Sequence, residues 1–248
     1  MLNPQLMKAG EPRVIRYKTL LMQRLLDHVR HGYRHHVSGV VHAERAKAFC
    51  EKFSDRYEIL LNTNQRAYRK ILGKANARLL FADLERGDSL HWFLMVTDGE
   101  HVAHKLEKLR DALVPGERIE VSGYELLKLP HSKHAGGGVR LTWRMTTAME
   151  RQWRYQIRST VRARRADELV TGLVRSLYQT PGFHTTRYQV GRLVTLLRAE
   201  WERSGRNTDS LPLPGALPYV RRMADESFTL EDWLASRLRQ QHNQRGDA

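Results

Sequence analysis

The sequence of 248 residues contains a single cysteine, Cys50. One cysteine cannot form a disulfide within the chain, and it cannot build a cysteine-based metal site. The sequence also lacks any run of about 18 apolar residues, the length that a membrane-spanning helix requires. Residues 1–10 lack the apolar core of a secretory signal. From these absences we expect a soluble, cytoplasmic protein with no membrane partner.

Catalytic signatures are missing as well. The sequence has no nucleophile elbow and no HExxH helix motif, and its Asp and Glu residues do not cluster as a two-metal nuclease site requires. Five histidines lie between residues 28 and 42, but no carboxylate or thiolate nearby completes a metal-ligand set. We therefore expect no metal and no other cofactor, and no motif supports an enzyme.

Acidic residues are too few to balance the basic ones. The chain has 42 Lys and Arg against 27 Asp and Glu, which gives a net charge of +15 and a pI near 10.3. Its 41% hydrophobic residues, including 5 Trp, suffice for a folded core. A folded protein with this surplus favours a polyanionic partner.

The surplus is concentrated in the middle of the chain. Residues 140–206 hold 14 basic and 5 acidic residues, whereas residues 207–248 hold 5 and 6. Every lysine lies at or before Lys133, and all later basic residues are arginines. Codon bias is one explanation; the other is selection for the planar, bidentate phosphate contacts that only guanidinium provides.

The hydrophobic pattern of the first part of the chain mixes helices and strands. Apolar periodicity predicts helices at 14–33, 43–57, 65–74 and 100–114, and strands at 36–42, 58–62, 78–84, 91–97, 118–129 and 139–146. This succession predicts an α+β fold with an antiparallel sheet. Its kernel fits the ferredoxin-like arrangement, with helices on one face of the sheet.

The remainder of the chain is helical by the same criteria. The apolar pattern there predicts helices at 147–178 and 186–203, a proline-containing linker at 210–219, and a docking helix at 230–240. We therefore expect three regions: an α+β domain at 1–146, an Arg-rich helical region at 147–206, and a linker with its docking helix at 207–248.

A row of arginines is the strongest functional signal. Its members recur every three or four residues, which places them on one face of a helix: Arg151, Arg154, Arg158, Arg162 and Arg165, with Tyr155 beside them. Guanidinium groups can track phosphates, and tyrosine can stack on bases. The alternative is a solvated helix face, but such a face normally mixes both signs of charge. We predict that this row binds nucleic acid.

Two further basic clusters are candidate phosphate contacts. The first is a glycine-rich hairpin, in which consecutive glycines let backbone N–H groups approach an oxyanion; an ordinary flexible tip is its alternative. Its candidates are Lys133, His134, Gly136, Gly137, Gly138 and Arg140. The second is the short helix at 65–74, where a tyrosine lies among cations. Its candidates are Arg66, Arg69, Lys70 and Lys74.

One segment offers a catalytic alternative. In Tyr33-Arg34-His35-His36, either histidine can act as general base on an RNA 2′-hydroxyl while arginine stabilises the phosphorane. This combination predicts a metal-independent endoribonuclease, similar to the enzymes that process CRISPR RNA.

Binding without catalysis is the main prediction. We expect contacts with RNA or with single-stranded or duplex DNA, made by one subunit of a larger assembly. In architecture the chain resembles the ferredoxin-like RNA-binding proteins of CRISPR effector complexes, and a DNA-binding accessory protein of a plasmid or other mobile element is an equal alternative. A third possibility is a basic partner of an acidic protein.

Overall fold

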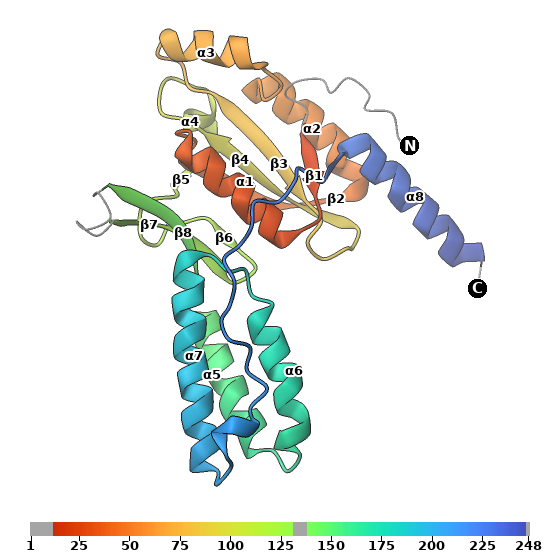
Figure 1. Cartoon of the computed structure of the whole chain (residues 1–248). Helices are drawn as coiled ribbons and strands as arrows, with labels where there is room; N and C mark the ends of the chain where they lie inside the picture. The colour runs from red at the N-terminus through yellow and green to blue at the C-terminus, as the bar shows by residue number, and fades with distance from the viewer. Residues whose placement is uncertain (1–11, 131–137, 247–248) are drawn as a thin grey trace. The chain divides into compact units, whose positions relative to one another are not determined.

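The chain divides into two compact units in the computed structural model, which describes residues 12–130 and 138–246 (Figure 1). Unit 1 runs up to Arg118 and resumes at Met223, and unit 2 is Ile119–Arg222. The boundaries expected after residues 146 and 206 therefore fall inside unit 2. Unit 1 is discontinuous because β9 (Ser227–Thr229) pairs with β1 (Arg13–Ile15), which joins the two ends of the chain.

Unit 1 contains a six-stranded sheet in the order β5-β2-β4-β3-β1-β9. Its kernel is a βαββαβ succession in which α3 is inserted between α2 and β3: β2 (His35–His42), α2 (Ala43–Tyr57), α3 (Thr63–Ile71), β3 (Ala77–Ala82), β4 (Ser89–Val96), α4 (Ala103–Leu106) and β5 (Arg110–Asp111). All neighbouring kernel strands are antiparallel. The last kernel strand, β5, lies beside the first, β2. The third kernel strand, β4, lies between β2 and β3, as in a ferredoxin-like sheet. The predicted α+β class with a mostly antiparallel sheet is confirmed.

Both faces of this sheet are covered. Alternate residues of β3 such as Leu79 and Phe81 join one core with Phe53 of α2 and Ala103 of α4. Trp233 of α8 (Leu230–Gly246) belongs to the same core. Figure 1 shows α1 (Lys18–Arg30) across the opposite face from α2. The two kernel helices thus share one face, and α1 is an addition on the other.

Local signals predict the type of two helices of unit 1, although the second covers 63–71 rather than the expected 65–74. α2 has the bounds that the sequence predicts, and it ends where Glu58 adopts a left-handed conformation. α3 (Thr63–Ile71) begins at a capping box, in which Asn62 accepts from the backbone N–H of Gln65 and the Gln65 side chain accepts from that of Asn62.

Three expected elements of unit 1 are wrong in type or length. The helix expected at 14–33 begins only at Lys18, because Val14 and Ile15 form β1. The strand expected at 58–62 is a turn that buries the single side chain of Ile59. The helix expected at 100–114 is limited to α4, and β5 follows it. At 14–33 and 100–114 sheet pairing outweighs a periodicity that favours a helix, and at 58–62 the burial of Ile59 is achieved by a turn instead of a strand.

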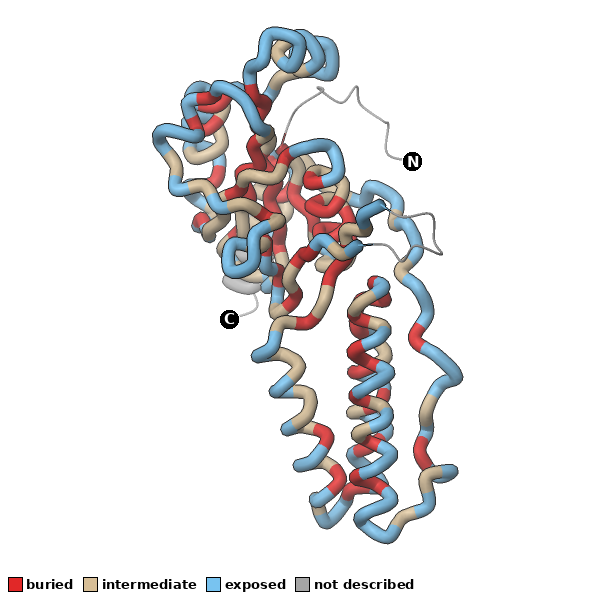
Figure 2. Tube along the Cα trace, turned by 90° about the vertical axis from the view of Figure 1, so that its left-hand side faces the viewer, coloured by how far each residue is buried: buried red, intermediate tan, exposed pale blue. Residues whose placement is uncertain are grey.

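Unit 2 combines a small sheet with three helices. Its antiparallel strands are β6 (Glu120–Val121), β7 (Tyr124–Pro130) and β8 (Val139–Met145), followed by α5 (Thr147–Arg162), α6 (Ala166–Tyr178) and α7 (His184–Arg203). The single helix expected at 147–178 is interrupted at Ala163, whose ψ of 147° is extended. Figure 2 shows buried and exposed segments alternating along these helices, because each helix buries one side.

The segment after α7 packs on unit 2 rather than forming a free linker. It begins with a short 3-10 helix, Thr208–Ser210, and continues without regular structure. Tyr178 donates its hydroxyl to the Pro214 carbonyl at 3.2 Å, and Arg187 donates to the Leu217 carbonyl at 2.6 Å. These contacts hold the segment along α6 and α7 (Figure 1).

No helix in the described ranges combines the length and the apolar character needed to cross a membrane.

Candidate nucleic-acid interface

Unit 2 carries most of the positive charge of the protein. Residues 119–222 contain 18 basic and 8 acidic residues, which gives +10 of the total of +15. The remaining +5 belongs to the longer unit 1. A polyanion would therefore be attracted mainly to unit 2.

One side of α5 presents cations to solvent. Ile157 and Val161 are buried on its inner side, where α5 packs against α6 and α7. On its outer side the exposed residues are Arg151, Tyr155, Arg158 and Arg162, which we call the arginine face. The Tyr155 side chain is 71% exposed. The helical spacing that the sequence predicts for these residues is confirmed as far as residue 162.

Only part of the expected row is available to a ligand. Within the described ranges, Arg151 and Arg162 have no hydrogen-bond or ion-pair partner. Arg154 is half-buried and bonds to Glu150 at 3.0 Å. Arg165 lies outside α5, at the N-terminus of α6, and pairs with Glu168. The row is therefore shorter than the sequence predicts, because the break after α5 turns Arg165 away from it.

Arg158 is paired with a buried carboxylate. Glu200 of α7, with a side chain only 8% exposed, accepts from Arg158 at 3.4 Å and from Arg203 at 2.8 Å. Burial disfavours the charge on Glu200, but hydrogen bonds and the charges of the two arginines outweigh it and lower the pKa of the carboxyl. Arg158 therefore stabilises the packing of α5 on α7 while its outer edge stays exposed.

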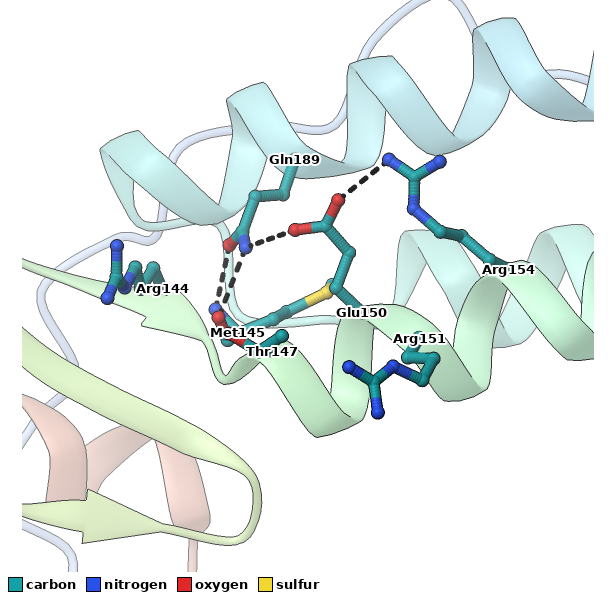
Figure 3. Close-up of a pocket in the computed structure, with 7 residues that line it drawn as sticks. All are labelled: Arg144, Met145, Thr147, Glu150, Arg151, Arg154 and Gln189. Atoms are coloured by element: carbon teal, nitrogen blue, oxygen red, sulfur yellow. Dashed lines mark hydrogen bonds and ion pairs between the residues drawn. The ribbon is translucent and has the colours of Figure 1, made fainter.

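A bonded cluster at the start of α5 joins it to β8 and α7 (Figure 3). The side chain of Gln189 accepts from the Met145 N–H at 2.7 Å and donates to the Met145 carbonyl at 3.1 Å. It also donates to Glu150 at 2.9 Å, and Glu150 accepts from Arg154 as described above. Burial opposes the charge of Glu150, yet Gln189 and Arg154 hold its pKa below the usual range.

An open hollow of about 260 Å³ lies beside this cluster. Its rim carries three guanidinium groups, those of Arg144, Arg151 and Arg154. Arg144 is bonded to Glu125 at 2.7 Å, and Figure 3 shows Arg151 pointing away from the Glu150 carboxylate. Glu150 also lines the hollow, and because Arg144 and Arg154 each have an acidic partner, Arg151 is the guanidinium group left to contact an anion.

Most of the predicted glycine-rich hairpin lies outside the described residues. Lys133, His134, Gly136 and Gly137 belong to that part of the chain. Gly138 is described and exposed, with φ of +99°, and Arg140 follows on β8, where it has an interaction partner.

Of the four basic candidates in and just after α3, two make structural contacts and two are exposed. Arg66 donates to the Ile59 carbonyl at 2.8 Å, and Arg69 pairs with Glu58 and donates to the Ala75 carbonyl. These two arginines hold the turn that follows α2. Lys70 and Lys74 are exposed, so only they remain as candidate phosphate contacts.

The structure does not bring the catalytic candidates together. Because successive residues of a strand point to opposite faces, His35 and His36 diverge. His35 forms a hydrogen bond with Asp98 at 2.7 Å, whereas His36 is fully buried and bonds to the Glu117 carbonyl at 2.8 Å.

Burial lowers the pKa of His36 to about 4, so this imidazole is neutral at pH 7 and closed to a substrate. The other two candidates are engaged elsewhere: Arg34 pairs with Asp111, and the buried Tyr33 hydroxyl accepts from Arg78 at 3.3 Å. The structure therefore does not bring the four candidates of residues 33–36 together, and a general-base role for the half-buried His35 stays a prediction.

No family model, curated protein or solved structure matches this chain.

The sequence gives no signal for the acidic partners of the arginines. Glu150 pairs with Arg154 inside α5, but the bonds of Glu200 to Arg158 and of Gln189 to Glu150 depend on how α5 and α7 pack. A search for acidic residues on the inner side of each helix would have suggested Glu150, which lies four residues before Arg154.

Proposed function

We propose that the protein binds the phosphate backbone of nucleic acid through the arginine face of α5. The observation that carries this proposal is the presence of two exposed arginines without partners, Arg151 and Arg162, on the same side of one helix as Tyr155. Eleven helical rises separate them, which is about 16.5 Å at 1.5 Å per residue. That span covers several phosphates of one strand.

The surrounding groups support this role. The hollow rimmed by Arg144, Arg151 and Arg154 offers a place for one phosphate at the start of the face. Tyr155 offers a ring on which a base can stack when the strand is single. Unit 2 as a whole attracts polyanions because of its charge of +10.

Phosphate contacts of this kind give affinity and orientation but carry no sequence information. We therefore infer that the protein acts as one subunit of a larger ribonucleoprotein or DNA-processing assembly, such as a CRISPR-type effector or the machinery of a mobile element. Selection of the target would then come from another component.

The decisive experiment changes only the unpaired arginines. Each phosphate contact contributes about 0.9 to the slope of log K against log salt on duplex DNA and about 0.7 on a single strand. Arg151→Gln with Arg162→Gln should thus lower the slope by about 1.4 to 1.8, which weakens binding about 25- to 60-fold near 0.1 M salt. Binding is measured by fluorescence anisotropy with labelled 30-mers of RNA and DNA at four salt concentrations.

A matched control removes the same charge from unit 1. Lys105→Gln with Lys108→Gln changes two exposed lysines of that unit and should reduce the slope little. Equal weakening by the two double variants would mean that the binding is diffuse, and the proposal would fail. Absence of binding to every oligonucleotide at 50 mM salt would also refute it.

A further inference from the structure

One strand edge of unit 1 is left open. β2 pairs with β4 along its entire length, from His35 to His42, but it pairs with β5 only at His35 and His36. Among the described residues, no backbone hydrogen bond reaches the outer side of residues 37–42. Alternate residues of this stretch therefore direct N–H and C=O groups to solvent.

Nothing in the sequence of this edge blocks another strand. Its residues Ser38, Gly39 and Val40 include no proline and no charge, and the pairing with β4 continues through them without a bulge. Val40 is 59% exposed. Natural proteins usually protect edges with charges, prolines, bulges or a covering element.

Unit 2 shows how this protein covers an edge. There, side chains of α7 satisfy the backbone of β8: Thr186 donates to the Trp143 carbonyl at 3.0 Å, and Gln189 bonds to both backbone groups of Met145. The open edge of β2 has no equivalent cover within the described residues.

A groove of about 680 Å³ adjoins the last three residues of the open edge. One wall is the strand at Val40, Val41 and His42, and the other is α2 at Arg45, Phe49 and Lys52. Phe49 packs at 5.1 Å from the ring of Trp92 and gives the groove an apolar middle. Trp92 in turn lies across Gly39, where an added Cβ would approach the indole to 2.8 Å.

The charged residues that line the groove favour an acidic ligand. Arg45 and Lys52 are exposed, and within the described ranges neither has an ion-pair partner. They lie two turns apart on α2, about 10.5 Å, with Phe49 between them. The only acidic lining residue, Glu44, is 3.7 Å from His42 at one end of the groove.

We propose that this groove binds an extended acidic peptide of a partner protein, which adds as an antiparallel strand to β2 in continuation of β5. Side chains on one face of a strand repeat every second residue, so positions i and i+4 lie about 13 Å apart. The matching pattern is acidic-x-apolar-x-acidic. The apolar side chain lies over Phe49, and the two carboxylates reach Arg45 and Lys52. Backbone hydrogen bonds give affinity, and the side chains give selectivity.

The test uses the full chain and a fluorescein-labelled octapeptide with the core Glu-Thr-Val-Thr-Glu. We expect a micromolar Kd by anisotropy. Arg45→Glu with Lys52→Glu should weaken binding at least tenfold, and a peptide with lysines in place of the two glutamates should bind this variant better than the original protein. Lys47→Glu, on the same helix outside the groove, is the charge control and should have little effect.

Strand addition has its own signature. Only alternate N–H groups of an added strand face β2, so N-methylation of one alternate set should abolish binding, whereas N-methylation of the other set should preserve it. The proposal would be overturned if N-methylation of the two alternate sets had equal effects, or if the octapeptide did not bind. It would also be overturned if the lysine peptide did not bind the glutamate double variant better than the original protein. A dimer in sedimentation that Val40→Lys dissociates would also overturn it, because a second copy would then occupy the edge.

The outcome is independent of nucleic-acid binding. The groove belongs to unit 1, and the arginine face belongs to unit 2. The groove variants should therefore leave the salt slope with oligonucleotides unchanged, and the arginine variants should leave peptide affinity unchanged.

Discussion

The burial of His36 makes the stability of unit 1 depend on pH. Its imidazole is fully buried on β2, and its pKa falls to about 4 in the folded protein against 6.5 for an unperturbed histidine. Between these values the unfolded chain binds the proton more strongly than the folded one. Stability is therefore complete above pH 6.5 and is lost as the pH falls toward 4.

The size of this effect follows from the two pKa values. Between pH 7 and pH 5, His36 alone should remove about 2 kcal/mol from the free energy of unfolding, because each unit of pKa difference corresponds to about 1.4 kcal/mol. His36→Gln, which can keep a hydrogen bond to the Glu117 carbonyl, should remove most of that dependence. The variant should be less stable than the original protein at pH 7 and closer to it at pH 5.

Hydrogen exchange of peptides from β2 and β4, corrected for intrinsic rates, reports on unit 1 separately from unit 2. The difference in protection between pH 7 and pH 5 is compared for the two proteins. If both lose protection equally, His36 does not carry the effect, and the reasoning from its burial is wrong. A difference of the opposite sign would show that the imidazole is charged in the folded state.

Two predictions concern packing. Asp83, only 1% exposed, accepts from the Trp233 indole at 2.9 Å and from Arg237 at 2.9 Å. Asp83→Ala should therefore destabilise unit 1 by about 3 kcal/mol and expose α8 to hydrogen exchange, whereas Asp83→Asn should cost less. In unit 2, Gln189→Ala should cost about 2 kcal/mol, because it removes both bonds to Met145, and urea denaturation measures the loss. No loss of stability in either alanine variant would show that these bonds contribute nothing.

Strand geometry explains why the two candidate histidines diverge. His35 and His36 are consecutive in the sequence, but both belong to β2, where an extended backbone turns neighbours to opposite faces. His36 entered the core and His35 met Asp98 at the surface. Proximity along the chain is therefore poor evidence for a joint site unless the segment is a loop.

Much of the fold followed from local pattern. The alternation of β2, the apolar stripe of α2 and the capping box of α3 are each set by residues close in the chain, so their type could be predicted, and for α2 the bounds as well. The α+β class followed from their succession. The interruption at Ala163 could not be predicted, because alanine and arginine favour helix and the break serves the packing of α5 against α6.

The sequence by itself determined the charge of this protein, its mixed α+β class and the helical spacing of Arg151, Arg158 and Arg162, because composition and periodicity are local properties. Only the tertiary structure decided which arginines are free, since Glu200 reaches Arg158 through the packing of α7 on α5 and the break after α5 separates Arg165 from the row. It also decided that β1 meets β9 and that the edge of β2 stays open. Pairing between distant segments depends on which surfaces can be buried together, and no single stretch of sequence encodes that choice.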